Sequence, residues 1–435
     1  MGGKTMRKWK TSESDPLRID EIQLDGCKIG ISFCPGKVQE FAMSGPWNRD
    51  LDADLDVIYS SGYNVVLSLI EYREFEELQV EGFLESAVQN NGMEWIWAPI
   101  RDGETPTPSN HSALGRALDA IKQDKSVFIH CKGGLGRAGS VAAWLLSHFG
   151  RTGLESIKEV RSIRKGAIEN DRQSQWVRGH AGKELGYEHT LLALNVNNTR
   201  PGSIRFQGLC HLFKSVRPSF LVLTECREDA FNFFCKELNA KDRIHAPADY
   251  WGNGIISLHH EFDESDCLDL PSNREHRSAA LAVIDVSSNQ RLRLIGAHLE
   301  VGSEEERILQ IDHLHDVADL WCSVLTGDLN SLLRSDYDGH HLERVLAKRD
   351  IAGKEPPEWE VMDDLVSNFS MIDAASFGNS RSTTPHFTRV DYLLFGTKSG
   401  FVPVMDSYDV VDCLTNKLTD HNAVFTAFQL DGSAL

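Results

Sequence analysis

Residues 129–137 constrain the fold of this chain more than any other stretch. They read Ile-His-Cys-Lys-Gly-Gly-Leu-Gly-Arg. An apolar run at 127–129 predicts a buried strand before them, and a periodic apolar run at 141–148 predicts a helix after them. The sequence therefore places one cysteine in a glycine-rich loop between the end of a strand and the beginning of a helix.

This loop predicts a phosphate-binding site that contains a nucleophile. Successive backbone N–H groups in such a loop form a concave anion site, and the helix dipole adds positive potential. The same field favours the thiolate of Cys131, while the planar guanidinium of Arg137 can bind two phosphate oxygens. A buried structural cysteine is the alternative, but it leaves the glycines and the arginine unexplained. We therefore expect Cys131 to attack a phosphate monoester and form a phosphocysteine. The loop residues expected to bind the phosphate are Lys132, Gly133, Gly134, Leu135 and Gly136.

The segments before this loop alternate between strand and helix patterns. Strands are predicted at 26–36, 64–70 and 93–100, and helices at 51–61, 75–90 and 109–123. This alternation favours an α/β fold with a largely parallel sheet. Asp102 lies in the loop that follows the third strand, where its carboxyl can protonate a leaving group. The alternative role for Asp102 is that of an ordinary turn residue.

Several of these segments resemble the Cys-based dual-specificity phosphatases, in particular the cyclin-dependent-kinase-associated phosphatase type. The matching segments are 99–106 (Pro-Ile-Arg-Asp-Gly-Glu-Thr-Pro), 130–137, 166–168 and the single residue Gln173. The resemblance covers about residues 22–180. It implies Cys131 as nucleophile, Arg137 as phosphate clamp, Asp102 as acid and Gln173 as a residue facing the site. It departs at Ala138, where many relatives carry a hydroxyl residue.

Length and composition indicate more than one domain. A chain of 435 residues is long for a single core. We expect a flexible N-terminus at 1–20, a phosphatase domain at 21–180, a linker at 181–189 and a second domain at 190–432. No apolar run reaches the length of a membrane span. The nine cysteines are scattered and form no Cys-x-x-Cys pair, which favours a reducing, cytoplasmic location.

Charge is distributed unevenly along the chain. Residues 1–184 hold 23 Lys and Arg against 26 Asp and Glu, whereas residues 185–435 hold 22 against 38. The acidic second half has no large basic surface for duplex nucleic acid. Most of its carboxylates keep the surface solvated, but some of them can collect divalent cations.

The second half has its own pattern of strands and helices. Strands are predicted at 191–196, 220–224, 255–258, 279–286, 291–297, 324–326 and 392–395, and helices at 204–215 and 304–321. This pattern favours a two-sheet α/β sandwich. Polar residues stand at the ends of these strands and in the loops beside them: Asn195, Glu225, His298, Asp328, Asn330, Asp391, Asp420 and His421. Each of these residues, taken alone, is typical of a turn or of a hydrogen-bonded histidine in the core. Together, each next to an apolar run, they predict a site for a hard cation such as Mg²⁺.

The order of these residues resembles the endonuclease/exonuclease/phosphatase superfamily over about 188–430. Residues 298–300 with 306, 307 and 310 are most similar to its tyrosyl-DNA phosphodiesterase branch. The resemblance implies that Glu225, Asn195 and Asp420 bind Mg²⁺ or Mn²⁺. It also implies roles in the reaction itself: Asp328 and Asn330 orient the attacking water, Asp391 or Asp420 partners His421, His421 and His298 contact the scissile phosphate, and Asn253 faces the substrate.

Together these features predict a bifunctional phosphoesterase. We expect the C-terminal domain to cut a phosphodiester and the N-terminal domain, which needs no cofactor, to remove the resulting monoester. A nucleic-acid end or a nucleotide conjugate fits as substrate, and no particular protein partner is indicated. Three alternatives stay open: an inositide or lipid phosphatase, which Lys132 favours; a signalling protein phosphatase with a targeting module; and a non-catalytic scaffold. The chain lacks the Pro-x-Trp-x-Asp-Arg motif of inositol phosphatases, because residues 385–391 are Pro-His-Phe-Thr-Arg-Val-Asp. This disfavours the inositide hypothesis.

Overall fold

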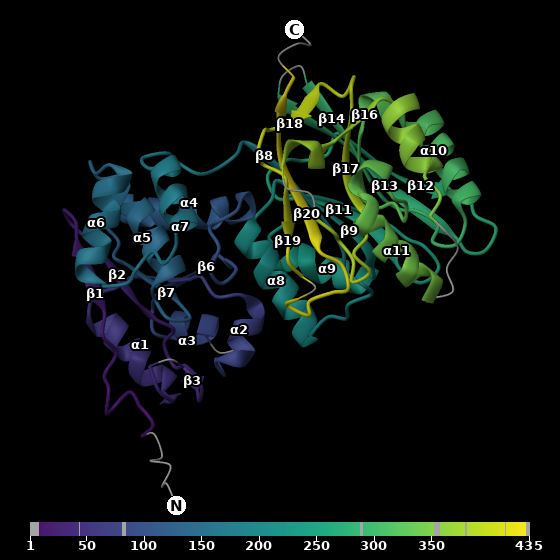
Figure 1. Cartoon of the computed structure of the whole chain (residues 1–435). Helices are drawn as coiled ribbons and strands as arrows, with labels where there is room; N and C mark the ends of the chain where they lie inside the picture. Colours follow the sequence, from purple (N-terminus) through teal and green to yellow (C-terminus); the bar gives the residue numbers. More distant parts are fainter. Residues whose placement is uncertain are drawn as a thin grey trace, which may run out of the picture. The chain divides into compact units, whose positions relative to one another are not determined.

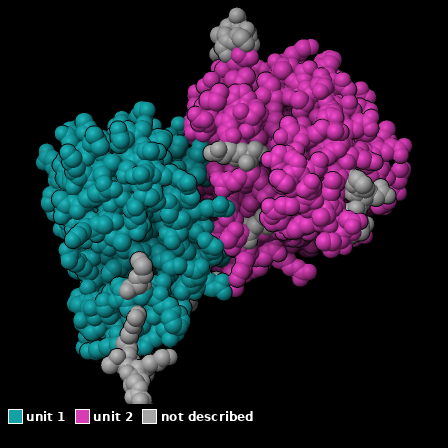
Figure 2. All heavy atoms as spheres, viewed as in Figure 1, with its two compact units in different colours: residues 1–186 teal, residues 187–435 magenta. Residues whose placement is uncertain are grey.

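The chain divides into two compact units, Met1–Gly186 and Tyr187–Leu435, each of which is described here by itself (Figure 2). The computed structural model describes residues 8–42, 44–80, 84–287, 290–351, 357–378, 381–413 and 415–431. Part of the predicted N-terminal segment 1–20 therefore lies outside the described residues. No helix in the described ranges combines the length and the apolar character needed to cross a bilayer.

The first unit is built on one five-stranded sheet (Figure 1). Its strand order is β1 (Asp20–Gln23), β2 (Lys28–Phe33), β7 (Val127–Cys131), β5 (Val65–Ser68) and β6 (Glu94–Trp97). Only β1 runs antiparallel to its neighbour, and the other pairs are parallel. The predicted α/β fold with a largely parallel sheet is therefore confirmed. The central strand β7 ends at Cys131, which places the thiol at the carboxyl edge of the sheet.

Seven α-helices accompany this sheet in the described part of the unit. They are α1 (Leu51–Ser60), α2 (Tyr72–Glu77), α3 (Leu84–Asn90), α4 (His111–Lys122), α5 (Gly136–Ser147), α6 (Gly153–Ile163) and α7 (Asp171–His180). The single helix predicted over 75–90 is wrong, because α2 and α3 are separate helices. The chain leaves α2 through Leu78, and Gln79 has the left-handed φ of 55°. In the sequence, Gly82 lies between the two helices and marks the break.

The second unit is a sandwich of two sheets, as the sequence predicted. One sheet has the order β10 (Asp242–Ala246), β11 (Gly252–Ser257), β9 (Phe220–Cys226), β8 (His189–Asn195), β20 (Ala423–Leu430) and β18 (Phe401–Pro403), with β19 (Asp409–Val411) also paired to β20. The other has the order β12 (Glu264–Leu270), β13 (Arg277–Ser287), β14 (Gln290–His298), β15 (Val324–Asp328), β17 (Asp391–Gly396) and β16 (Met371–Asp373). The apolar faces of the two sheets form one shared core that includes Val222, Leu294 and Phe395.

Helices cover the outer faces of this sandwich (Figure 1). Helices α10 (Glu304–Ala318) and α12 (Glu360–Asp363) contribute Ile311 and Val361 to a second core cluster with Leu325 of β15. On the other side, Phe206 of α8 (Ile204–Val216) stacks on Phe234 of α9 (Glu228–Glu237) at 4.4 Å. A further helix, α11 (Gly339–Ile351), follows β15 in the chain.

Strand register brings the polar strand ends of the second unit together. His298 at the end of β14 pairs with Asp328 at the end of the parallel strand β15, and Asp328 pairs with Asp391 at the start of β17. In the facing sheet, Asn195 ends β8 beside the parallel strand β9, which carries Glu225. Since parallel strands end at the same edge of a sheet, these side chains share one end of the sandwich.

Candidate active sites

In the first unit, the thiol of Cys131 lies at the bottom of the loop that joins β7 to α5. Cys131 is 3% exposed, and its Sγ accepts a hydrogen bond from the Gly134 N–H at 3.2 Å. Helix α5 begins at Gly136, so its N-terminal N–H groups lie beside the loop. Gly134 is required there, because its φ is 71° and an added Cβ would come within 2.2 Å of the Ser32 carbonyl oxygen. The loop therefore packs tightly against β2.

Arg137 is held beneath the loop by a bidentate ion pair with Glu74 of α2. Its Nη1 and Nη2 donate to the two Glu74 carboxylate oxygens at 2.5 and 2.9 Å, and Nη1 also donates to the Ile100 carbonyl at 2.9 Å. Burial disfavours the charge of Arg137, but the hydrogen bonds to Glu74, together with the negative charges of Cys131, Glu74 and Asp102, raise the pKa of the guanidinium above its usual value. The predicted phosphate clamp is thus charged and fixed in place.

The predicted acid lies close to this clamp. An Asp102 carboxylate oxygen is 3.0 Å from Arg137 Nη2, and the Asp102 side chain is 66% exposed. Two residues near the start of α7 hold the Asp102 loop, since the Asn170 amide donates to the Gly103 carbonyl at 2.9 Å and the Gln173 amide donates to the Glu104 carbonyl at 3.3 Å. Gln173 thereby positions the loop, and its contact with substrate stays a prediction.

The structure adds residues that the sequence analysis missed. Arg164, just after α6, donates to the backbone carbonyls of Gly133 and Gly134 and to an Asp20 carboxylate oxygen. It therefore fixes the shape of the phosphate-binding loop. Lys132 points to α2, where its ammonium donates to Glu77 at 2.6 Å. No motif links Arg164 or Glu74 to the loop, because their contacts span tens of residues along the chain.

Ser140 carries the hydroxyl nearest in sequence to Ala138, and that hydroxyl already forms a hydrogen bond. Ser140 donates to the Gly136 carbonyl at 2.8 Å within α5. Its hydrogen is therefore directed at the helix backbone. Ala138 itself is fully buried and offers no hydroxyl.

In the second unit, Glu225, His298 and Asp328 converge at one end of the sandwich. One ligand atom from each lies within 4.8 Å of the others, a spacing that can hold a metal ion. Glu225 has the left-handed φ of 47°, a conformation that costs a non-glycine residue about 1–2 kcal/mol and is common at functional sites. The amide of Asn195 donates to both carboxylates at 3.0 Å each, while its oxygen accepts the Asn197 N–H. Asn195 thus orients the carboxylates, and its role as a direct ligand stays a prediction.

The electrostatics of these carboxylates fit a bound cation. Burial raises the pKa of Asp328, and the nearby Asp391 raises it further. Burial likewise raises the pKa of Glu225, with a smaller contribution from Asp328. Oxygen ligands of this kind, crowded together with little solvent, match the preference of Mg²⁺ or Mn²⁺.

Two histidines flank the carboxylates and differ in charge. The Asp391 carboxylate accepts a hydrogen bond from His421 Nδ1 at 2.8 Å, so that Asp391 rather than Asp420 is the partner of His421. Burial opposes the charge of His421, but Asp391 and then Asp328 raise its pKa to about 10. Burial lowers the pKa of His298 to about 4. A charged and a neutral imidazole therefore face the same space.

The remaining predicted residues surround this group. The Asn330 N–H donates to Asp328 at 3.0 Å, and the Asn330 amide donates to the Leu299 carbonyl at 3.0 Å. Asp420 lines the same pocket from the loop before β20. Asn253 is 3% exposed, and its amide donates across to the Ser278 carbonyl of β13 at 2.7 Å, which links the two sheets. Its contact with substrate stays a prediction.

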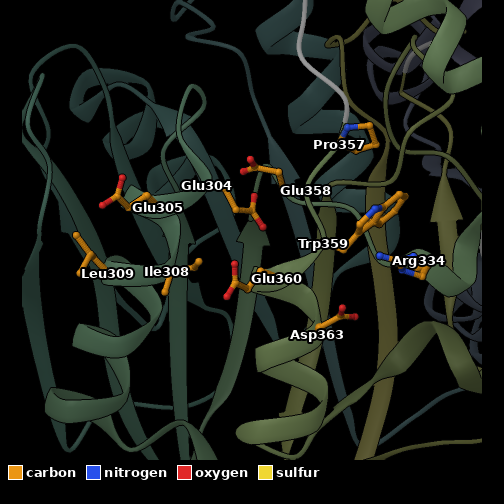
Figure 3. Close-up of a pocket in the computed structure, with 10 residues that line it drawn as sticks. All are labelled: Glu304, Glu305, Ile308, Leu309, Arg334, Pro357, Glu358, Trp359, Glu360 and Asp363. Atoms are coloured by element: carbon orange, nitrogen blue, oxygen red, sulfur yellow. The ribbon is translucent and has the colours of Figure 1, made fainter.

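A cavity of about 580 Å³ opens over this group. The predicted site residues that line it are Glu225, His298, Asp328, Asn330, Asp420 and His421. An acidic hollow adjoins it and shares Glu304 and Glu358 with it (Figure 3). The hollow is lined by Glu304, Glu305, Ile308, Leu309, Arg334, Pro357, Glu358, Trp359, Glu360 and Asp363.

Comparisons with known proteins find both of the resemblances named from the sequence. Residues 41–151 match a family model described as "Polymorphic toxin system, DSP-PTPase phosphatase". Cyclin-dependent kinase inhibitor 3 of Rattus norvegicus is 28% identical over 186 residues, which cover 40% of this chain and 84% of the rat protein.

Solved structures align with larger parts of the chain at lower identity. An endonuclease/exonuclease/phosphatase from Beutenbergia cavernae is 17% identical with a TM-score of 0.44, covering 56% of this chain and 72% of its own. The D. rerio TDP2 complexed with single strand DNA product is 18% identical with a TM-score of 0.40, covering 55% and 98%.

These findings define the class of the protein. The loop with Cys131 and Arg137 lies inside the matched phosphatase region, and the chain is a hydrolase that acts on phosphoester bonds. Its first unit carries a dual-specificity-phosphatase-like domain.

Proposed function

We propose that the chain has two separate catalytic centres, which act in sequence on a nucleic-acid end or a nucleotide conjugate. The phosphatase domain is assigned to 21–180, the linker to 181–189 and the metal-dependent phosphodiesterase domain to 190–432. The observation that supports this proposal best is the convergence of Glu225, Asp328 and His298 in a unit distinct from the one that holds Cys131.

The first centre uses sulfur as the nucleophile. The Cys131 thiolate attacks the phosphorus of a monoester, whose oxygens are bound by the loop N–H groups and by Arg137. The P–O bond to the leaving group breaks, and Asp102 supplies the proton that the leaving oxygen needs. Water then attacks the phosphocysteine, which releases inorganic phosphate and restores the thiolate. No metal takes part in this scheme.

The second centre uses water directly. Glu225 and Asp328 would hold Mg²⁺ or Mn²⁺, with Asn195 orienting both carboxylates and Asp420 nearby. When bound, the ion polarises the phosphodiester and offsets the charge that develops on it. Asp328 and Asn330 orient the attacking water. The charged His421, fixed by Asp391, and the neutral His298 bind the phosphate oxygens.

The two reactions fit one order. A phosphodiester is not a substrate for a Cys-based phosphatase loop that binds three free phosphate oxygens, but the product of its hydrolysis is a monoester. We expect a nucleotide diester to yield free phosphate and a dephosphorylated product in the complete chain. In the Cys131→Ser chain, the same reaction should stop at the monoester.

A time course with thymidine 5′-(p-nitrophenyl phosphate) tests this order. The Cys131→Ser chain should accumulate thymidine 5′-phosphate in proportion to released nitrophenol, whereas the parent chain should release thymidine and phosphate. Chromatography of the nucleotide products measures both. Equal monoester accumulation in the two proteins would refute the coupling, and the absence of nitrophenol release in both would refute the second centre.

A further inference from the structure

We propose that the C-terminal pocket contains a second anion subsite, formed by Lys348 and Arg349 of α11, which binds a phosphate group of the substrate other than the scissile one. This inference rests on the phosphodiesterase proposed above and specifies its substrate as a short diester or chain end that carries a second phosphate.

The size of the pocket points to a substrate larger than one phosphate. Its volume of about 580 Å³ lies within the range of about 300–1,000 Å³ typical of small-molecule sites. Glu225, Asp328 and His421 line it. Lys348 and Arg349 line it as well, so that the pocket contains cations that the diester reaction itself does not use.

Lys348 is held at the pocket wall in a way that keeps it available. Its ammonium lies 4.1 Å from the centre of the Phe387 ring and donates to the Pro385 carbonyl at 3.4 Å. Pro385 lines the pocket too. An ammonium has three donors, and an aromatic face restricts its position without occupying them. Lys348 can therefore bind an anion inside the pocket.

Arg349 is in a position where an anion would stabilise it. Burial lowers the pKa of Arg349 and the positive charge of Arg307 lowers it further, while Tyr337 and Glu304 raise it in part. Arg307 is paired with Glu304 and donates to the Glu300 carbonyl at 2.8 Å. A phosphate near Arg349 would offset both the burial and the repulsion, because charge-assisted hydrogen bonds are strongest where solvent is scarce.

The neighbouring acidic hollow determines the direction in which the substrate extends. Glu304 and Glu358 line both cavities, and the hollow adds three more carboxylates against Arg334, the one cation among its described lining residues (Figure 3). The carboxylates of the hollow repel an anionic substrate. Glu358, which also lines the pocket, repels it there too. Lys348 and Arg349 of α11 add positive charge to the wall of the pocket itself.

A pair of chromogenic diesters tests the subsite. The probes are thymidine 5′-(p-nitrophenyl phosphate) and the same ester with a 3′-phosphate, assayed with Mg²⁺ in the Cys131→Ser chain, so that the first centre cannot remove the 3′-phosphate. We expect kcat/KM to be about tenfold or more higher for the probe with the 3′-phosphate, mainly through KM, since a charge-assisted hydrogen bond contributes about 1.5–3 kcal/mol. Lys348→Met and Arg349→Met should each lose most of that preference and keep activity on the simpler probe.

Arg344→Met is the matched control, because Arg344 also stacks on Phe387, at 4.6 Å, but is not among the residues that line the pocket. It should keep the preference. Equal rates on the two probes, or an equal loss on both in Lys348→Met, would overturn the subsite. If neither probe is cleaved, the proposed reaction fails, and calorimetry with thymidine 3′,5′-bisphosphate decides the subsite alone: a tenfold weaker affinity in Lys348→Met supports it, and an unchanged affinity refutes it.

Discussion

Serine in place of Cys131 is expected to lower kcat for p-nitrophenyl phosphate, in the presence of EDTA, by about four orders of magnitude or more. The hydroxyl is a far weaker nucleophile than the thiolate, although the loop N–H groups, Arg137 and Asp102 stay in place. Steady-state rates measure the loss. Binding of vanadate to the variant, followed by calorimetry, would show that the loop still forms.

Cys34→Ala is the matched control for this loss. Cys34 follows Phe33, which pairs with Cys131 across the sheet, and burial raises the pKa of its thiol well above the usual value. It therefore stays protonated and takes no part in the reaction. We expect its replacement to change kcat by less than about threefold, because a thiol that stays protonated is not the nucleophile. A loss as large as that of Cys131→Ser would contradict the assignment of the nucleophile.

Asp328→Asn is expected to lower phosphodiester hydrolysis by about three orders of magnitude or more and to leave the EDTA-resistant monoesterase unchanged. The Asp328 carboxylate accepts hydrogen bonds from the Asn195 amide and the Asn330 N–H, and it lies 3.7 Å from His421 and 3.8 Å from His298. One neutral amide in its place removes a metal ligand and leaves both histidines in position.

A thermal readout separates metal binding from catalysis in this variant. Mg²⁺ that binds the folded chain raises its melting temperature by mass action, so millimolar Mg²⁺ should stabilise the parent second unit and should not stabilise Asp328→Asn. Asp285→Asn, an exposed change on β13, is the control and should respond like the parent. Equal stabilisation of all three proteins would mean that Asp328 does not bind the ion.

The sequence predicted which residues would gather at each site because these residues lie at the ends of apolar strands. Cys131 and Arg137 are six positions apart around one loop, so local pattern alone brings them together. His298, Asp328 and Asp391 are far apart in the chain, yet each terminates or opens an apolar run, and strand register then aligns them. The α/β class of both halves followed from the same alternation.

The contacts that hold the site residues in place could not be predicted from the sequence. Glu74 of α2 pairs with Arg137 of α5 across 63 positions of the chain, a contact that no local pattern predicts. Arg164 reaches the loop carbonyls from α6 through tertiary packing. The edge strand β12 was missed for another reason: most of its residues are exposed and polar, so it lacks the apolar pattern that predicts a strand.

Asn195 shows how far the contacts of one side chain depend on other segments. The resemblance implies that it helps to bind the metal ion, and this stays a prediction. In the structure, its amide oxygen accepts the Asn197 N–H and its amide hydrogens are donated to Glu225 and Asp328. Which end of an amide faces a site depends on neighbouring donors and acceptors, and these come from segments distant in the chain.

The effect of chelation on both activities of one preparation tests the central claim most directly, namely that sulfur serves one centre and a carboxylate-held cation the other. With EDTA, cleavage of thymidine 5′-(p-nitrophenyl phosphate) should vanish and should return with Mg²⁺. Hydrolysis of p-nitrophenyl phosphate should change by less than about twofold. Diester cleavage that survives EDTA, or loss of both activities together, would contradict two chemically separate centres.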